Sequence, residues 1–131
     1  MRMIWFVALG SGFGGAARLL IGGWIQNRFG PSFPLGTLAI NITGSLLLGF
    51  LLRYALETPA IGPDTRALLT TGLCGGYTTF STFSYETVRL FEDGEYRRAA
   101  LYVALSVGLA LLAMACGMLL AREVLAFRRR W

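Results

Sequence analysis

Four long apolar stretches alternate with three short polar segments along the chain. The stretches cover about residues 3–24, 35–54, 65–90 and 99–124, and all four prolines fall between them. Because a helix needs about 20 mostly apolar residues to cross a bilayer, each stretch is long enough for one span. The pattern predicts an all-α membrane protein, a single domain over residues 1–131 with four transmembrane helices.

The composition agrees with this prediction. Hydrophobic residues make up 55% of the chain, charged residues make up 15%, and the mean hydropathy is +0.59, whereas an ordinary soluble domain has roughly 25% charged residues. The first stretch begins at Met3 without a small-residue cleavage pattern, so we expect a retained span and not a leader peptide. Four spans leave little room for a soluble catalytic domain, and the absence of a catalytic constellation argues against an enzyme.

Charge is carried by 12 arginines and 7 carboxylates, which give a net charge of +5 without any histidine. The arginines lie mostly near the ends of the apolar stretches and cluster only at residues 128–130, which favours anchoring at lipid headgroups over nucleic-acid binding. Trp131 is a candidate interfacial anchor beside them. Cys74 and Cys116 fall inside predicted spans, apart from any CxxC or Cys/His cluster, so we expect both to be buried apolar residues.

Four spans place both termini on the same side of the membrane. Seven arginines fall on that side and four on the other, and the two sides balance when the last three arginines are set aside. The excess of arginine that usually fixes orientation is therefore weak. Insertion in both orientations is compatible with the sequence.

The third apolar stretch contains the sequence GGYTTFSTFS at residues 75–84, near its centre. Gly75 and Gly76 each cost a helix interior roughly 1 kcal/mol relative to alanine, and Thr78 and Thr79 are β-branched. These residues predict an interruption of the helix at membrane depth, where freed backbone groups must be satisfied by protein, water or an ion. Carbonyls at such a break bind cations, and amides bind anions. The alternative is a packing motif whose hydroxyls bond back to the preceding turn.

Polar side chains also follow one face of the second stretch. Thr37, Asn41 and Ser45 recur at intervals of four in an otherwise apolar segment, so they share one helical face. Polar groups at membrane depth need partners. We therefore expect this face to lie against other protein groups.

Aromatic and hydroxyl side chains gather just after the predicted break. If the helix resumes near Thr79, one face carries Thr79, Thr82, Phe83 and Glu86, with Phe80 on an adjoining face. The edge of a phenyl ring is electropositive, so ring edges with amide and hydroxyl donors could coordinate a small anion weakly enough to release it. Helix packing is the simpler interpretation of the two phenylalanines on sequence alone.

Two charged residues allow two interpretations each. Arg18 either extends to the lipid interface or faces inward and binds carbonyls at a helix end. Glu86 is either a buried carboxylate bonded to hydroxyls or an interfacial residue where the helix leaves the membrane. We prefer the interfacial interpretation of Glu86.

Three motifs together resemble the Fluc (CrcB) family of fluoride channels: PLGTLAINITGS from Pro34, GLCGGYTTFSTFS from Gly72, and GGAAR in the first stretch. The similarity extends over nearly the whole chain, including its length and its four apolar stretches. The GGxTTFSTF core is the most specific of these signals, and it is unbroken in this chain.

The resemblance implies an antiparallel, dual-topology homodimer in the inner membrane of the cell, with two fluoride pathways and passive, selective fluoride export. It also implies a structural sodium ion at the centre of the dimer, coordinated by the backbone carbonyls of Gly75 and Thr78. The residues that it places along the fluoride pathway are Asn41, Phe80, Phe83, Tyr102, Ser81, Thr82, Thr37, Ser106, Glu86 and Arg18. Lipid and a second copy of the chain are the implied partners, and nucleic acid is not.

Two other classes of protein remain open. A small antiparallel proton-coupled multidrug exporter has a similar size and span count, but it needs a carboxylate deep in a span, and the acidic candidates Glu86 and Glu123 both lie near span ends. A membrane scaffold without transport activity would use the small-residue faces only for association. The polar face of Thr37, Asn41 and Ser45 argues against the scaffold.

Overall fold

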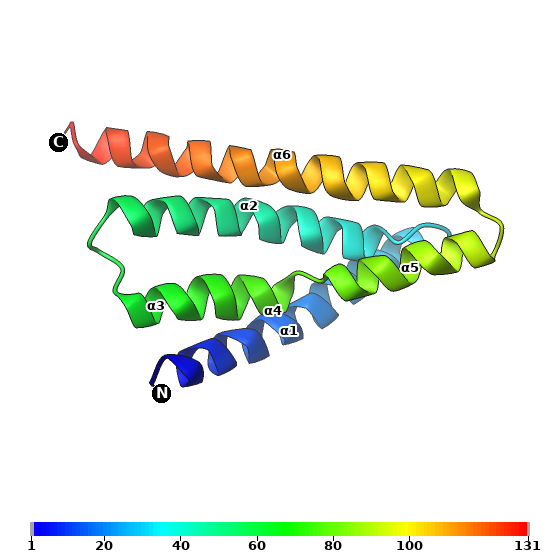
Figure 1. The fold of residues 1–131 in the computed structure, drawn as a ribbon, viewed down its shortest axis with the longest axis horizontal. Coiled ribbons are helices and arrows are strands. Elements are labelled where there is room, and N and C mark those ends of the chain that lie inside the picture. The colour runs from blue at the N-terminus through cyan, green and yellow to red at the C-terminus, as the bar shows by residue number, and fades with distance from the viewer. Residues whose placement is uncertain (1, 131) are drawn as a thin grey trace.

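The computed structural model describes residues 2–130, and every regular element among them is helical (Figure 1). Three helices are long and apolar enough to cross a membrane: α1 (Arg2–Phe29), α2 (Leu35–Glu57) and α6 (Tyr96–Arg128). These helices confirm the prediction of an all-α, multi-pass membrane protein. The candidate anchor Trp131 lies outside the described residues.

The long helices extend past the apolar stretches that predict them. Arginine is a good helix former, so polar turns around Arg28 and Arg97 continue the helices into their charged flanks. α1 ends at Phe29, just before Gly30, and the segment before α6 turns at Gly94; both glycines have positive φ, +85° and +75°. Other residues adopt this backbone conformation at a cost, so these glycines mark the ends of the helices.

Residues 63–92 form several consecutive helical pieces. They are α3 (Pro63–Ala67), the π-helix η1 (Leu68–Cys74), α4 (Gly75–Tyr77) and α5 (Phe80–Glu92). Thr78 and Thr79 are extended, with φ/ψ of −80°/159° and −151°/111°. Figure 1 shows the chain straightening between α4 and α5 before it continues towards the turn that leads to α6.

Small residues let the helix backbones approach closely. A Cβ at Gly49 of α2 would overlap the Met114 carbonyl of α6, and one at Gly117 would overlap the Leu46 carbonyl of α2. α2 and α6 consequently lie side by side over most of their length (Figure 1). Such contacts are typical of helices that associate within a membrane.

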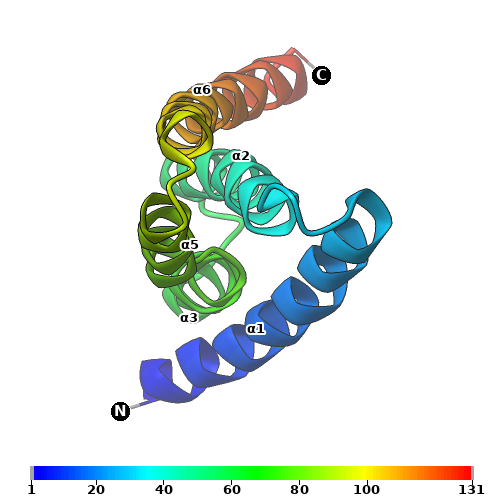
Figure 2. The same ribbon diagram turned by 90° about the vertical axis from the view of Figure 1, so that its right-hand side faces the viewer.

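α1 packs in the same way against the interrupted segment. A Cβ at Gly10 would overlap the Leu68 carbonyl, and one at Gly14 would overlap the Leu73 carbonyl. The small residues of the first apolar stretch therefore pack on protein. Viewed from the end of the molecule, α1 crosses the other helices obliquely (Figure 2).

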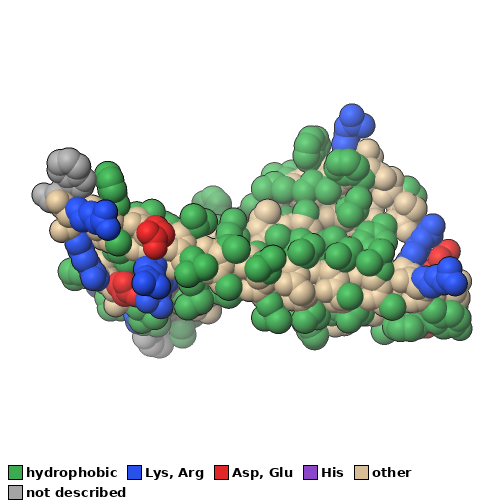
Figure 3. Space-filling view, turned by 90° about the horizontal axis from the view of Figure 1, so that it is seen from above, with side chains coloured by type: hydrophobic (Ala, Val, Ile, Leu, Met, Phe, Trp, Pro, Cys, Tyr) green, Lys and Arg blue, Asp and Glu red, His purple; other side chains and the backbone are tan. Residues whose placement is uncertain are grey.

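Few large side chains are buried in the single chain. The main apolar cluster consists of Leu38, Phe83 and Tyr102, while large apolar side chains cover the middle of the surface and charged groups gather at both ends (Figure 3). Cys74 is buried as expected, but Cys116 is exposed. That correction arises because Cys116 lies on a face of α6 that no other helix of this chain covers.

Candidate functional site

Asn41 holds both backbone groups of Thr79 at the break. Its Oδ1 accepts a hydrogen bond from the Thr79 N–H at 2.7 Å, and its Nδ2 donates to the Thr79 carbonyl at 3.0 Å. Thr79 is only 7% exposed, so these groups would otherwise be buried without partners. One amide on α2 thereby takes the place of a helical backbone at this position.

α5 begins with a side-chain cap. Thr79 is the N-cap residue, and its Oγ1 accepts from the Thr82 N–H at 3.2 Å. The same hydroxyl donates to Thr82 Oγ1 at 2.9 Å and lies 3.3 Å from Ser81 Oγ. Threonine is a favoured N-cap residue because its oxygen satisfies an amide that has no partner within the helix.

The hydrogen bonds made by Asn41 and by the Thr79 hydroxyl leave two carbonyls without their helical donors. In a continuous α-helix the Thr79 N–H would donate to the Gly75 carbonyl, and the Thr82 N–H would donate to the Thr78 carbonyl. Asn41 takes the first donor and the Thr79 hydroxyl takes the second. The Gly75 and Thr78 carbonyls therefore lose the donors that a helix would supply.

Arg18 of α1 faces these groups. Its Nη1 donates to the Thr78 carbonyl at 3.3 Å. Of the two interpretations that the sequence allows, the structure supports the one in which Arg18 faces inward and binds a carbonyl at a helix end. Gly75 is exposed, and a Cβ there would meet only the Thr70 carbonyl, at 3.9 Å. The backbone at Gly75 can therefore be approached from outside the chain.

Glu86 has two hydroxyl partners from other helices. Its Oε1 accepts from Thr37 Oγ1 at 2.9 Å, and its Oε2 accepts from the Tyr102 hydroxyl at 2.6 Å. Glu86 is half-buried, and Tyr102 is fully buried. The interpretation preferred from the sequence, an interfacial carboxylate, is corrected here: Glu86 joins α2, α5 and α6 through hydrogen bonds.

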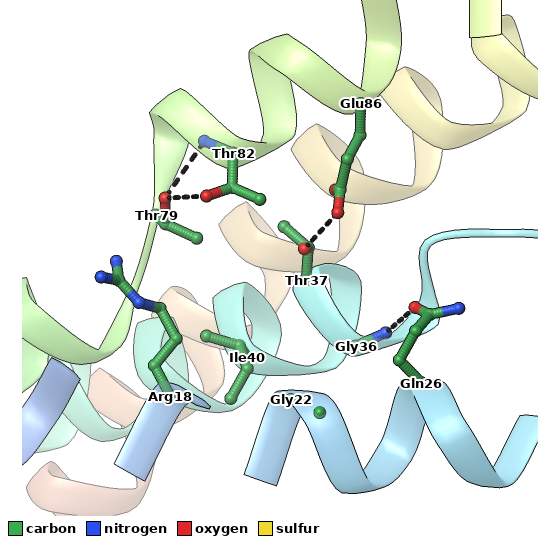
Figure 4. A pocket seen from close by; sticks show the side chains of 10 residues that line it. Arg18, Gly22, Gln26, Gly36, Thr37, Ile40, Thr79, Thr82 and Glu86 are labelled. Carbon is green, nitrogen blue, oxygen red and sulfur yellow. Dashed lines mark hydrogen bonds between the residues drawn. The ribbon is translucent and has the colours of Figure 1, made fainter. Parts of the chain in front are cut away.

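A cavity of about 250 Å³ lies between α1, α2 and the start of α5 (Figure 4). Arg18 is the one basic side chain and Glu86 the one acidic side chain among its described lining residues. The lining consists of Arg18, Gly22, Gly23, Gln26, Gly36, Thr37, Ile40, Thr79, Thr82 and Glu86. We call this the charged cavity.

A second cavity, of about 290 Å³, lies on the other side of the break, and its described lining carries no charged side chain. Its polar lining residues are Asn41, Ser45, Thr78, Thr79 and Ser106, and its aromatic ones are Phe80 and Phe83. We call this the phenylalanine cavity.

The polar and aromatic groups of the phenylalanine cavity lie close together. The ring centroids of Phe80 and Phe83 are 5.5 Å apart at an interplanar angle of 48°. Ser106 Oγ is buried and has no hydrogen-bond partner among the described residues. A buried hydroxyl without a partner is costly, so a ligand that accepts a hydrogen bond would be favoured there.

The residues selected from the sequence divide between the two cavities. Arg18, Thr37, Thr82 and Glu86 line the charged cavity, and Asn41, Phe80, Phe83 and Ser106 line the phenylalanine cavity. Tyr102 joins the first group through Glu86, and Ser81 lies beside the Thr79 hydroxyl. Thr79 lines both cavities and so connects them.

Sequence reasoning missed Gln26 as a site residue. Its Nε2 donates to the carbonyls of Gly30 at 2.6 Å and Phe33 at 3.0 Å. Its Oε1 accepts from the Gly36 N–H at 3.0 Å, the bond drawn in Figure 4. These bonds hold the turn between α1 and α2 against the charged cavity. In the sequence, Gln26 is simply the first polar residue of a loop, and no pattern distinguishes it.

Carbonyl oxygens are the groups best suited to hold a metal ion in this chain. No set of three or more His, Cys, Asp or Glu side chains that could bind one occurs within the described residues 2–130. Hard cations such as alkali and alkaline-earth ions prefer oxygen ligands, including backbone carbonyls. The carbonyls of Gly75 and Thr78 are groups of this kind, and the Thr78 carbonyl also accepts from the Arg18 guanidinium at 3.3 Å.

Comparisons with known proteins agree on one family. The model of the family described as "CrcB-like protein, Camphor Resistance (CrcB)" matches residues 5–118. The chain is 42% identical over 124 residues to the fluoride-specific ion channel FluC of Rhizobium meliloti (strain 1021), covering 95% of this chain and 99% of that protein. It is 43% identical over 119 residues to the protein of the same name from Syntrophotalea carbinolica, covering 91% and 97%. The identity to the Aquifex aeolicus protein of that name is 47% over 95 residues, 72% of this chain and 77% of that protein.

Proposed function

Because the chain belongs to the CrcB family, we propose that it is a fluoride-specific ion channel through which fluoride leaves the cytoplasm passively. The observation that carries this proposal is the phenylalanine cavity. There two phenyl rings, the Asn41 amide and the unpartnered Ser106 hydroxyl meet without any charged side chain in the described lining. Relatives named as fluoride-specific channels, 42–43% identical over more than nine-tenths of the chain, support the same function.

The chemistry of this cavity suits a small anion that must bind and leave. Hydroxyl and amide donors replace part of the water shell of fluoride, and the electropositive edges of Phe80 and Phe83 add weak attraction. A fixed cation in the cavity would hold the anion too tightly for rapid passage. In this proposal the hydroxyls of Thr79, Ser81 and Thr82 extend the row of donors towards the charged cavity. Arg18, Thr37 and Glu86 line the opening there, and Tyr102 holds Glu86 from behind.

Export needs no energy source beyond the membrane potential. Hydrogen fluoride enters a cell as a neutral molecule, ionises at cytoplasmic pH and is trapped as the anion. An interior-negative potential drives the anion out with about 2.3 kcal/mol per 100 mV. A passive, selective pore in the cell inner membrane would therefore reduce fluoride toxicity.

A structural sodium ion is the second part of the proposal. The Gly75 and Thr78 carbonyls have lost their helical donors, and Gly75 is exposed on the surface. Two carbonyls are too few for a cation site, but a second copy related by a two-fold axis would supply two more. When bound, sodium would offset the released carbonyls and join two chains, and it would take no part in conduction.

This arrangement requires an antiparallel homodimer. In each chain, residues 63–92 would form the third of four spans, between α2 and α6. The pieces α3, η1, α4 and α5 together run between the same two ends of the molecule as the long helices (Figure 1). The near-balance of arginines between the two sides supports insertion in both orientations. Lipid and the second copy would cover the exposed apolar surface.

One observation favours a second function, proton-coupled multidrug export. Glu86 is half-buried and bonded to Thr37 and Tyr102, so a carboxylate does lie between the helices. A coupled exporter would move protons when substrate is added. Substrate-driven proton flux in liposomes, with no fluoride flux, would support the exporter and reject the channel.

Fluoride efflux from liposomes tests the channel directly. Purified protein is reconstituted into vesicles loaded with potassium fluoride, and a fluoride electrode records loss after valinomycin is added to balance the charge. We expect rapid efflux of fluoride and, in matched vesicles loaded with potassium chloride, no efflux of chloride. Equal rates for the two anions, or no efflux at all, would reject the proposal.

A further inference from the structure

Asn41 connects the phenylalanine cavity to the backbone of the break. Its side chain lines that cavity, and the same amide binds the N–H and the carbonyl of Thr79 at 2.7 and 3.0 Å. No other side chain binds both backbone groups of a residue at the break in the described chain.

The bond to the Thr79 N–H has a consequence four residues earlier. α4 ends at Tyr77, and the Thr78 N–H still donates to the Cys74 carbonyl at 3.0 Å, as in a helix. The next amide in that series is Thr79, whose helical acceptor would be the Gly75 carbonyl. Because Asn41 takes that amide, the helical series stops at the residue whose carbonyl becomes free.

We propose that Asn41 is the positioning residue for the sodium ion, since it withholds the Thr79 amide from the Gly75 carbonyl and so keeps that carbonyl available to the cation. This inference rests on the proposed function, specifically on sodium bound at Gly75 and Thr78. Asn41 acts through Thr79 and does not touch the ion.

The amide of asparagine is suited to this role because it carries an acceptor and a donor in one plane. Its oxygen holds the Thr79 N–H and its nitrogen holds the Thr79 carbonyl, so Thr79 stays extended at φ/ψ of −151°/111°. An aliphatic side chain of similar size offers neither group. The buried Thr79 N–H would then be stabilised most by a hydrogen bond to the Gly75 carbonyl, which adds one more helical hydrogen bond.

The Thr78 carbonyl loses its helical donor by a separate route and accepts from Arg18 Nη1 at 3.3 Å. The Thr79 hydroxyl, and not Asn41, binds the Thr82 N–H that would otherwise reach it. Loss of Asn41 should therefore remove one of the two carbonyls from each chain and leave the other. Sodium binding should weaken and not vanish.

The test measures sodium binding by the full-length protein, apart from any fluoride flux. Purified protein is titrated with sodium chloride against N-methyl-D-glucamine chloride at constant ionic strength, and the thermal unfolding midpoint is recorded at each concentration. Wild-type protein should be stabilised by sodium. In Asn41→Leu, the sodium concentration for half-maximal stabilisation should rise at least about tenfold, a change of about 1.4 kcal/mol in binding free energy.

Two further variants make the result specific. Asn41→Asp retains an acceptor for the Thr79 N–H, so it should keep the sodium response while its negative charge blocks fluoride efflux. Ser45→Ala, one turn along the same face of α2, lines the same cavity without binding Thr79 and should leave the sodium response unchanged. If Asn41→Leu does not fold, Asn41→Ala is measured in its place.

The outcomes distinguish the role of Asn41 from the existence of the sodium site. If wild-type protein shows no sodium-specific stabilisation, the sodium site itself is rejected and the inference with it. If wild-type protein responds and the leucine or alanine variant has the same midpoint, sodium binding stands but the role of Asn41 is overturned. If the aspartate variant loses the response as fully as the leucine variant, the acceptor is not what matters and the inference is likewise overturned.

Discussion

Arg18 on α1 donates a hydrogen bond to the carbonyl of Thr78, 60 residues away in the sequence, at 3.3 Å. This contact brings the one basic side chain in the described lining of the charged cavity to the edge of the helix break. Under the proposed function, this arginine would raise the electrostatic potential of the opening, which it shares with the Glu86 carboxylate, without entering the phenylalanine cavity. It would attract an anion to the opening, and the weaker contacts of the phenylalanine cavity would let the anion pass.

Removing this charge should slow fluoride entry. A unit charge a few Å from an anion in a protein interior contributes a few kcal/mol at most, so we expect Arg18→Gln to reduce fluoride efflux by about tenfold or more. Arg18→Lys keeps the charge and should retain most of the rate. Efflux from liposomes is compared at matched protein content. Equal rates for the glutamine variant and wild type would show that Arg18 does not attract the anion.

Substitutions of the two phenylalanines should differ in their effect on protein stability but have the same effect on fluoride efflux. Phe83 is buried and packs against Tyr102 with ring centroids 5.3 Å apart, whereas Phe80 is 78% exposed in the single chain. Phe83→Ile should therefore lower the free energy of unfolding by about 1 kcal/mol, and Phe80→Ile should change it little. Both variants should abolish fluoride efflux because isoleucine offers no electropositive ring edge.

Efflux assays and size-exclusion chromatography distinguish this prediction from a packing role. A variant that still conducts fluoride at the wild-type rate would remove that ring from the pathway. A variant that fails to conduct because it no longer assembles would support the scaffold interpretation.

Tyr102→Phe isolates the hydrogen bond to Glu86 from the packing of the ring. The phenyl ring would keep the edge contact with Phe33, at 5.5 Å between centroids, but Glu86 Oε2 would lose the donor at 2.6 Å. Hydrogen bonds to charged groups contribute about 1.5–3 kcal/mol, so the free energy of unfolding should fall by roughly that amount. Thermal unfolding with and without the substitution measures the difference, and an unchanged midpoint would mean that Glu86 finds another donor.

Helix packing makes a prediction independent of ion conduction. A Cβ at Gly117 would overlap the Leu46 carbonyl, whereas nothing lies within 4 Å of a Cβ at Gly108 on the same helix. Gly117→Ala should therefore destabilise the protein by about 1–3 kcal/mol, and Gly108→Ala should not. The yield and unfolding midpoint of the two variants are compared directly. Similar values for both would contradict the close approach of α2 and α6.

The sequence predicts the apolar helices well because hydrophobic length alone determines them. The weak helix formers from Gly75 to Thr79 likewise indicate where regular helix is hardest to maintain, and the structure has extended residues at Thr78 and Thr79. Local preference decides both features. The family was also predicted correctly, from the unbroken motif that begins at Gly75.

Features that depend on contacts between distant residues could not be predicted in this way. The π-helix η1 lies where Gly10 and Gly14 of α1 bring two backbones together, and no local pattern in residues 68–74 marks it. The hydroxyl partners of Glu86 come from α2 and α6, 49 and 16 residues away. Spacing along one helix places Glu86 on a face but does not say which helices meet that face.

Bi-ionic recording in a planar bilayer tests whether the protein forms a fluoride-selective pore. Equal concentrations of fluoride and chloride, with the same impermeant cation, are placed on opposite sides of a membrane that contains the purified protein. A fluoride-selective pore should give a reversal potential beyond about 120 mV in the direction of fluoride flow, because each tenfold preference is worth about 59 mV for one charge. A reversal potential near zero, or the absence of any protein-dependent current, would contradict the account.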